Sequence, residues 1–381
     1  MMKRVLLLSC STGQGHNSCA EAVKEYFEEQ HVVCEIYDSL KFIGEKFARF
    51  MSWGHSFMYR HIPGLFRWGY RYSEGHPNVF QPNSCIYKLL TTGAEHLYDY
   101  IVDGKYDTVI CTHIFSAVIL THSLKHYKLA VNTAFVATDY TCYPGVEASD
   151  LQNYFIADTS LTDTYVKCGI PIQRIFAAGI PVRKSFFQKT AREEAKASLD
   201  IDRNSSHLLI MCGSMGCGPI KTVLRQIAKA LPDQAEVSVI CGTNKRLYKA
   251  LNYRYRKSSR IHIVGYTDKV SLYMDSADLY LTKPGGISVT EAAIKQCPML
   301  FINAVAGCEQ YNMDFFLCIH SAVTERKPKH LAQKSIDLLR SERKRRYMEE
   351  RLREHQRPDG AAQIYAQLSR CSNEIGAVKT S

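Results

Sequence analysis

The stretch Leu281-Thr-Lys-Pro-Gly-Gly-Ile-Ser-Val-Thr-Glu-Ala-Ala293 joins the end of an apolar strand to a Gly-Gly turn and the start of a helix. Ser288 stands three residues before Glu291, a spacing that predicts a capping box. A helix start presents unsatisfied N–H groups and the positive end of the helix dipole, and glycines let a ligand approach them. The stretch therefore predicts either an anion-binding turn or an ordinary capped strand-turn-helix.

The amino terminus predicts a second unit of this kind. Residues 3–9 have the pattern of a buried strand, residues 10–17 form a loop containing Gly13, Gly15 and His16, and residues 18–30 have helical periodicity. Ligands bind beyond the carboxyl ends of parallel strands, so this loop is expected to face a ligand. On local evidence alone, His16 could equally be a solvated surface residue.

Two further strands are expected to deliver polar groups at their carboxyl ends. Asp139 follows residues 132–138, where its carboxylate could act as a general base, orient His16, or cap the next turn. Residues 207–213 open into a glycine-rich loop at 213–218 that would also suit a dinucleotide-binding fold. However, the next strand, residues 237–242, is not followed by the acidic residue that binds the ribose in such folds.

The composition limits the partners without choosing among them. A formal charge of +11 suits nucleic acid, an anionic membrane or an anionic substrate. The fourteen cysteines include no Cys-x-x-Cys pair, which predicts reduced thiols in a cytoplasmic protein and no zinc site. Residues 1–10 resemble a lipoprotein signal, but their apolar run, Val5 to Leu8, is short beside the about 7–15 residues of a signal core. A buried strand is expected there instead.

The segment 41–72 interleaves aromatic and basic residues and contains both tryptophans of the chain. Aromatic rings beside cations on amphipathic helices are typical of an interfacial membrane element. The alternative is a helix pair that packs its rings into the core. No stretch approaches the about 18 apolar residues of a spanning helix, so membrane contact is expected to be peripheral. The aromatic residues are Phe42, Phe47, Phe50, Trp53, Phe57, Phe66 and Trp68, and the basic residues are Lys41, Lys46, Arg49, Arg60, Arg67 and Arg71.

Six motifs in one order carry a resemblance that runs over nearly the whole chain. It is to the GT-B glycosyltransferases that include plant monogalactosyldiacylglycerol synthases, bacterial processive diacylglycerol glucosyltransferases and, more distantly, the cell-wall N-acetylglucosaminyl transferase that makes lipid II. This chain departs from that pattern at Gln14, at Tyr140 to Val146 and at Cys308. The motifs are Gly13-Gln-Gly-His16, Thr138-Asp139, Gly179-Ile-Pro-Val-Arg183, Gly213-Ser-Met-Gly216, Thr282-Lys-Pro-Gly-Gly-Ile-Ser-Val-Thr-Glu291 and Gly307-Cys-Glu-Gln-Tyr-Asn312.

The resemblance implies an α/β protein with the GT-B fold: two Rossmann-like domains facing a central cleft, with a C-terminal helix that crosses back to the first. A chain of 381 residues is long enough for two cores. We expect an acceptor- and membrane-binding domain at 1–183, a linker at 184–205, a nucleotide-sugar-binding domain at 206–358, and the crossing helix at 359–381.

The resemblance also implies roles for individual residues. His16 and Asp139 would carry the acceptor-side proton chemistry, and Glu291 would bind the ribose unless its capping role prevails. Glu309 and Asn312 would hold the donor sugar. The other nucleotide-sugar contacts are expected from Gly213, Ser214, Gly216, Tyr266, Gly285, Gly286 and Ile287, and the acceptor and membrane contacts from Gly15, Trp53, Phe57 and Trp68.

The reaction so implied is an inverting transfer of a hexose from a UDP-sugar to diacylglycerol or a glycosyl-diacylglycerol. It would take place at the cytoplasmic membrane face, without nucleic acid. The resemblance implies metal-independent chemistry, so neither a metal nor another cofactor is expected. The alternatives are a transferase acting on a cell-wall lipid and a degenerate sugar-nucleotide sensor without turnover.

Overall fold

The computed structural model describes residues 2–11, 13–213, 218–302, 304 and 307–380. The chain divides into two compact units, each described below by itself. Unit 1 comprises Met1–Lys184, Ala306–Cys308 and Arg357–Ser381, and unit 2 comprises Ser185–Val305 and Glu309–Gln356.

Unit 1 is built on a parallel six-stranded sheet of order β2-β1-β3-β4-β5-β6. Its strands are β1 (Arg4–Ser9), β2 (Val33–Asp38), β3 (Thr108–Cys111), β4 (Asn132–Val136), β5 (Asn153–Phe155) and β6 (Ile175–Phe176). Its α-helices are α1 (Gln14–Glu29), α2 (Glu45–His61), α3 (Pro63–Gly75), α4 (Cys85–Thr91), α5 (Ala94–Asp103), α6 (Ile114–Tyr127), α7 (Thr162–Lys167) and α16 (Gly360–Thr380). Short 3₁₀ turns are η1 (Ser39–Phe42), η2 (Pro77–Phe80), η3 (Val146–Ala148), η4 (Thr159–Leu161) and η5 (Ile172–Arg174).

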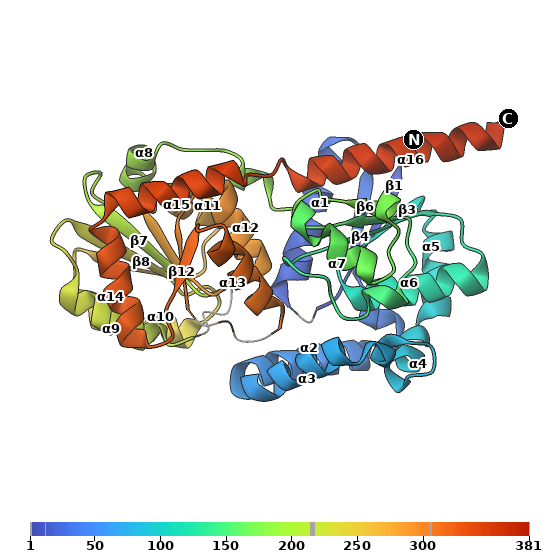
Figure 1. Ribbon diagram of the computed structural model, residues 1–381, viewed down its shortest axis with the longest axis horizontal. Coiled ribbons are helices and arrows are strands. Elements are labelled where there is room, and N and C mark those ends of the chain that lie inside the picture. The colour runs from blue at the N-terminus through green and yellow to red at the C-terminus, as the bar shows by residue number, and fades with distance from the viewer. Residues whose placement is uncertain (1, 12, 214–217, 303, 305–306, 381) are drawn as a thin grey trace. The chain divides into compact units, whose positions relative to one another are not determined.

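Unit 2 repeats this design with the strand order β12-β11-β10-β7-β8-β9, again parallel. Its strands are β7 (Ser206–Met211), β8 (Ala235–Ile240), β9 (Ile261–Val264), β10 (Leu279–Thr282), β11 (Met299–Phe301) and β12 (Ala322–Thr324). Its α-helices are α8 (Arg192–Ala197), α9 (Ile220–Ala230), α10 (Lys245–Tyr255), α11 (Val270–Ser276), α12 (Gly286–Ile294), α13 (Cys308–Cys318), α14 (Pro328–Leu339) and α15 (Glu342–Glu354). The turn η6 (Lys184–Phe186) stands where the chain passes from unit 1 to unit 2. In Figure 1 unit 1 carries the elements α1 to α7 and β1 to β6 together with α16, and unit 2 carries β7 to β12 and α8 to α15.

The two parallel sheets confirm the predicted fold class. Their central strands, β1, β3 and β4 in unit 1 and β7, β8 and β10 in unit 2, are buried along almost their whole length. Val5 to Leu8 are fully buried in β1, so the run that resembles a signal core is the first strand, as expected. In the range 184–205, expected to be a linker, the structure places α8, whose Lys196 pairs with Asp278 of unit 2 at 3.0 Å. Residues 185–205 therefore belong to the second core.

The helix α1 begins earlier than the sequence pattern predicts. Gly13 adopts an extended conformation as the N-cap, and the helix starts at Gln14 rather than at Ser18. Gly15 and His16 therefore lie in the first turn of α1 and not in a loop. Gly15 and His16 still lie beyond the carboxyl end of β1, as predicted.

The C-terminal helix α16 packs on α1 within unit 1. The Tyr365 ring lies against Phe27, with ring centroids 5.3 Å apart. Arg357, just before the helix, donates to Asp158 at 2.6 Å, and Asp359 caps the helix by accepting from Ala361 N at 2.9 Å. The end of the chain is thereby fixed to its beginning, as the predicted crossing helix requires.

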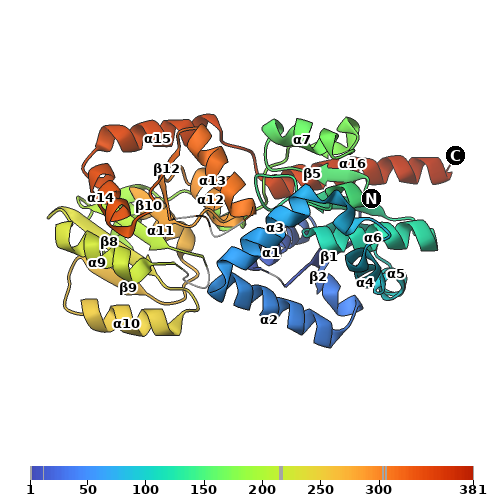
Figure 2. The same cartoon turned by 60° about the horizontal axis from the view of Figure 1, so that its bottom comes forward.

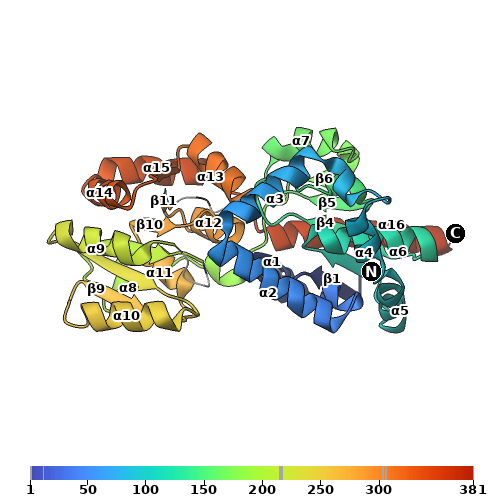
Figure 3. The same ribbon diagram turned by 90° about the horizontal axis from the view of Figure 1, so that it is seen from below.

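Among the described residues, no helix combines the length and the apolar character needed to span a membrane. The successive helices α2 and α3, joined at Ile62, carry the interleaved aromatic and basic residues. They come forward in Figure 2 and lie in front of the sheet of unit 1 in Figure 3.

Candidate functional site

In unit 1, three neighbouring strands bring polar groups to one sheet edge. His16 follows β1, Thr112 follows β3, and Thr138 and Asp139 follow β4, in the strand order β1-β3-β4. The His16 Nδ1 atom lies 2.7 Å from the Thr112 carbonyl oxygen and 3.1 Å from Thr138 Oγ1. A carbonyl can only accept, so Nδ1 carries the proton and Nε2 holds the lone pair of the neutral ring. The half-buried imidazole is thus oriented as a base.

Asp139 is connected to His16 through a chain of hydrogen bonds. Thr138 Oγ1 lies 2.8 Å from the Tyr143 hydroxyl, which donates to Asp139 Oδ2 at 2.8 Å. Tyr143 also accepts from the Thr138 backbone N–H at 3.1 Å, which fixes its oxygen in place. Tyr143 is absent from the predicted site. The signal that could have indicated it is the departure from the family pattern at residues 140–146.

Burial and charge act in opposite directions on the His16 ring. Burial lowers the pKa of His16 below 6.5, while the negative charge of Asp139 and the bond to Thr112 raise it. The His113 ring lies edge-on at 4.5 Å, and burial lowers the pKa of His113 well below 6.5. His16 is therefore neutral near pH 7 and can accept a proton, and Asp139 is placed to stabilise the resulting cation.

In unit 2, the ends of β7 and β10 form a candidate site of their own. Gly213 has φ +69°, and a Cβ there would lie 2.7 Å from Cε of Lys283. The Lys283 side chain lies over this glycine and its Nζ pairs with Glu309 Oε1 at 2.9 Å. Glu309 is 6% exposed and Lys283 retains access to solvent. Lys283 lies inside the motif at residues 282–291 but is not among the predicted site residues.

The helix α12 does not begin with the predicted capping box. Gly285 is its N-cap without a side-chain bond, so Ser288 lies inside the helix and Glu291 is a buried residue of its second turn. The Gly285 N–H donates to the Lys283 carbonyl at 2.9 Å and so closes the turn. The groups that a helix start leaves to a ligand are therefore the N–H groups from Gly286 and Ile287 onward.

Asn312 has a different position from the one expected. It is fully buried, and its Nδ2 donates to the Pro284 carbonyl at 2.9 Å, so it supports the Lys283–Gly286 turn. A side chain without exposed surface does not contact a bound sugar in this conformation. Tyr266 is 78% exposed beyond the carboxyl end of β9. The predicted contacts Ser214 and Gly216 lie outside the described residues.

The aromatic residues of segment 41–72 fall into two groups. Phe42 and Phe47 pack in or against the core of unit 1. Trp53 is 62% exposed, Trp68 63% and Phe57 40%, so the core interpretation is wrong for these three rings. Trp53 stacks on Phe57 at 5.3 Å and Trp68 on Tyr72 at 5.6 Å, which makes two exposed aromatic pairs. The side chains of Arg60 and Phe66 lie outside the described residues.

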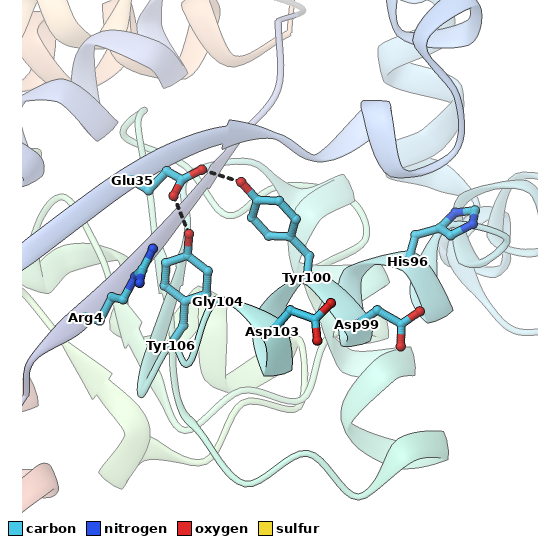
Figure 4. Close-up of a pocket in the computed structure, with 8 residues that line it drawn as sticks. All are labelled: Arg4, Glu35, His96, Asp99, Tyr100, Asp103, Gly104 and Tyr106. Carbon is cyan, nitrogen blue, oxygen red and sulfur yellow. Dashed lines mark hydrogen bonds between the residues drawn. The ribbon is translucent and has the colours of Figure 1, made fainter.

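Two surface hollows lie away from these groups. The hollow in Figure 4 has a volume of about 470 Å³ and includes Arg4 of β1 and Glu35 of β2. There Glu35 accepts from the hydroxyls of Tyr100 and Tyr106, which lowers its pKa. The second hollow, of about 540 Å³, is lined by Asp202, Asn204, Ser205, Asp233, Gln234, Glu236, Ser259 and Arg260. Arg4 begins β1, and the second hollow lies beside the first residues of β7, β8 and β9, so neither hollow is at a carboxyl edge.

Family models match both units. The model of monogalactosyldiacylglycerol synthase matches residues 16–182, and the model of the glycosyltransferase family 28 C-terminal domain matches residues 207–364. A processive diacylglycerol beta-glucosyltransferase of Staphylococcus epidermidis is 26% identical over 326 residues, covering 82% of this chain and 79% of the relative. One of Bacillus cytotoxicus is 24% identical over 367 residues, covering 95% and 92%.

Solved structures share the fold. MurG of Acinetobacter baumannii has a TM-score of 0.64 at 14% identity, covering 97% of this chain and 99% of that one. MnaA of S. aureus, solved with UDP, has a TM-score of 0.63 at 12% identity, covering 98% and 97%. At these identities the likeness concerns the two-domain α/β fold alone.

Proposed function

We propose that this chain, which belongs to the glycosyltransferases described by the monogalactosyldiacylglycerol synthase and family 28 models, transfers a hexose from a UDP-sugar to diacylglycerol or a glycosyl-diacylglycerol. The acceptor class is supported by the printed activity of the bacterial relatives. The observation that carries the chemistry is the orientation of His16, whose Nδ1–H is held by the Thr112 carbonyl and whose Nε2 is left as a base.

On the acceptor side, Nε2 of His16 takes the proton of the acceptor hydroxyl. The hydroxyl oxygen then forms a bond to the anomeric carbon while the bond from that carbon to the phosphate oxygen breaks, so a single displacement inverts the anomeric centre. Asp139 stabilises the imidazolium, because its charge favours the protonated ring. Thr138 and Tyr143 hold the Asp139 carboxylate and the His16 ring in their relative positions.

On the donor side, negative charge grows on the departing diphosphate and needs fixed positive partners. The N–H groups at the start of α12 supply part of this positive charge. The ammonium of Lys283 has three donors, so it can keep Glu309 and also meet a phosphate oxygen. Glu309 then presents its second oxygen to a sugar hydroxyl, and Glu291 is the proposed ribose ligand.

The proposal includes no metal ion or other cofactor. Its support is that Lys283 and the start of α12 provide positive charge at the place where a divalent ion would otherwise be needed. Turnover is therefore expected to be unchanged by a chelator, with magnesium added back as the comparison. Loss of turnover in the chelator, restored by the ion, would show that a metal takes part.

The α2–α3 pair is the proposed membrane contact, peripheral and at the cytoplasmic face. Its support is the exposure of Trp53, Trp68 and Phe57 next to exposed basic residues, since rings enter the headgroup boundary while cations meet anionic lipid. An enzyme whose lipid acceptor stays in the bilayer has to bind that acceptor at the membrane surface. In this proposal the acceptor-binding unit lies at the surface that holds its substrate.

The test is an assay of the purified protein with labelled UDP-glucose or UDP-galactose and liposomes containing diacylglycerol. We expect a glycosyl-diacylglycerol whose anomeric configuration, read by NMR, is opposite to that of the donor. His16→Asn should reduce turnover by about 10²–10⁴-fold without weakening UDP binding. Transfer only to a cell-wall lipid acceptor, or UDP binding without any transfer, would overturn the proposal in favour of the corresponding alternative.

A further inference from the structure

Two cysteines of unit 1 lie side by side next to the acceptor-side residues. Cys142 Sγ donates to Cys168 Sγ at 3.5 Å. Cys142 stands in the loop between Asp139 and η3, and Cys168 is the C-cap of α7. Both are free thiols and both are half-buried. A disulfide needs an S–S distance of about 2.05 Å, so the two sulfurs have to approach by roughly 1.5 Å.

The contact makes the two thiols chemically different. Because the Cys142 thiol donates to Cys168, it lowers the pKa of Cys168 to about 7. The same contact, followed by burial, raises the pKa of Cys142. A thiolate is the nucleophile in exchange with a disulfide, so Cys168 is the attacking residue of the pair.

Among the described cysteines, Cys111 and Cys297 lack this combination. Burial raises the pKa of Cys111 and of Cys297, which lie in the two cores. Cys85 is exposed at the first residue of α4 and serves below as the matched control. Access to solvent and a lowered pKa coincide at Cys168, whose neighbours Lys167 and Gly169 are exposed.

We propose that Cys142 and Cys168 form a site of reversible oxidation, at which exchange with a small disulfide such as oxidised glutathione produces an intramolecular disulfide. The Cys168 thiolate attacks one sulfur of the small disulfide, forming a mixed disulfide and releasing one thiolate. Cys142 then loses its proton to solvent, attacks Cys168 Sγ and releases the second. Two protein thiols and one small disulfide become one protein disulfide and two small thiols.

The site is coupled to the chemistry through the loop it anchors. Tyr143 follows Cys142 directly and holds Asp139 with its hydroxyl. Thr141 precedes Cys142, and its carbonyl accepts from Tyr165 of α7 at 3.3 Å. Drawing the two sulfurs together moves this loop against α7 and displaces Tyr143 from Asp139. This second half of the inference rests on the proposed function, whereas formation of the disulfide does not.

The first experiment detects the bond directly. The reduced full-length protein is incubated with oxidised glutathione near neutral pH, alkylated, digested without reduction and analysed by mass spectrometry. We expect a peptide pair joined through Cys142 and Cys168 that separates after dithiothreitol. Cys142→Ser should retain one glutathione on Cys168, Cys168→Ser should leave Cys142 as a free thiol, and Cys85→Ser should still form the linked pair.

Opposite outcomes overturn the inference. A protein whose Cys142 and Cys168 remain alkylated, or a glutathione trapped on Cys142 instead of Cys168, would contradict the site or its order of attack. For the coupling, the linked protein should lose turnover by up to about 10²-fold, the cost of a displaced catalytic group, while UDP affinity stays unchanged. Equal turnover of the linked and reduced forms would contradict the coupling. If neither form shows turnover, the proposed function fails, and the linked peptide still shows whether Cys142 and Cys168 form a disulfide.

Discussion

At the scale of single residues, Tyr143 shows how the carboxylate of Asp139 is held. Its hydroxyl accepts from the Thr138 N–H and donates to Asp139, so one oxygen fixes both the strand end and the carboxylate. Replacing it leaves a buried carboxylate short of a donor, and such a loss costs about 1–3 kcal/mol for a buried group. In the proposed function its role is to position Asp139.

The first prediction is that Tyr143→Phe lowers turnover by about 10²-fold while UDP affinity is unchanged, because Asp139 leaves its position beside His16. Calorimetry with UDP and a pH profile of kcat/KM measure the two parts. The profile of the parent should lose activity on the acid side below 6.5, where His16 becomes protonated. Tyr154→Phe, which removes a hydroxyl bonded to Ser149 at 2.9 Å in the same unit, is the control and should keep near-normal turnover.

Lys283 carries the second prediction at this scale. Lys283→Met removes the charge offered to the diphosphate and leaves Glu309 without this partner, so UDP should bind about 10-fold more weakly or worse, consistent with about 1.5–3 kcal/mol for a charged hydrogen bond. Isothermal calorimetry measures the affinity. Lys245→Met, at an exposed position on α10, is the matched control. An unchanged affinity in Lys283→Met would remove Lys283 from the donor site.

At the scale of elements, α2 and α3 expose apolar surface that would be expensive to leave in water. Trp53 on α2 and Trp68 on α3 are each more than half exposed. The basic side chains beside them contribute about 1 kcal/mol each near an anionic surface. The two helices therefore combine the two attractions that interfacial binding requires.

We predict that Trp53→Ala with Trp68→Ala abolishes sedimentation with vesicles rich in anionic lipid and leaves the melting temperature close to that of the parent. Exposed rings contribute little to the fold, so loss of binding without loss of stability distinguishes a surface role from a core role. Binding by the parent should also weaken as added salt shortens the Debye length from about 10 Å towards 3 Å. Ile172→Ala, another exposed apolar residue of unit 1, should bind like the parent.

The strand β7 carries a buried histidine that links it to two other elements. His207 Nε2 lies 2.9 Å from Ser238 Oγ of β8, and Nδ1 lies 3.0 Å from Ser276 Oγ of α11. Burial lowers the pKa of His207 from 6.5 to about 3. Between these two pH values the unfolded chain binds a proton at His207 that the native state does not. The contribution of His207 to the free energy of unfolding is therefore fully present above about pH 6.5 and is lost as the pH falls towards 3.

Urea unfolding at about pH 7.5 and about pH 5 tests this directly. The free energy of unfolding changes with pH in proportion to the difference in protons bound by the unfolded and native states. The parent should be less stable at the lower pH. In His207→Gln, whose amide can still donate to one serine and accept from the other, the difference should shrink. His16 and His113 act in the same direction, so some dependence should remain. A parent protein that is more stable at pH 5 would contradict the sign.

At the scale of the whole molecule, the sequence is informative where patterns are local. Buried runs such as Val5 to Leu8 predict parallel strands, and the carboxyl-edge rule predicts that His16 and Asp139 share an edge. The capping box at Ser288 was wrong because Gly285 starts the helix from the turn itself. Lys283 was missed because its partner Glu309 lies 26 residues further along the chain. Tyr143 was missed because its bond to Asp139, only four residues back, depends on the path of an irregular loop.

The C-terminal helix ties the end of the chain to its beginning at one close approach. A Cβ on Gly360 would lie 2.9 Å from the Gly179 carbonyl oxygen, a backbone atom that cannot move aside as a side chain can. Gly179 itself belongs to the turn after β6, and Arg357 bonds Asp158 beside it. The docking of α16 on unit 1 therefore depends on the absence of one methyl group.

The last prediction is that Gly360→Ala destabilises the protein by about 1–3 kcal/mol, the usual cost of overpacking, because the backbone of the Gly179 turn has to shift. Hydrogen exchange should increase in α16 and in its partner α1, while β7, β8 and β10 of unit 2 remain protected. Gly69→Ala in α3 is the matched control, since a Cβ there meets no atom within 4 Å. In a helix interior that change stabilises by roughly 0.5–1 kcal/mol. Equal effects of the two substitutions would show that the close approach at Gly360 does not hold the helix in place.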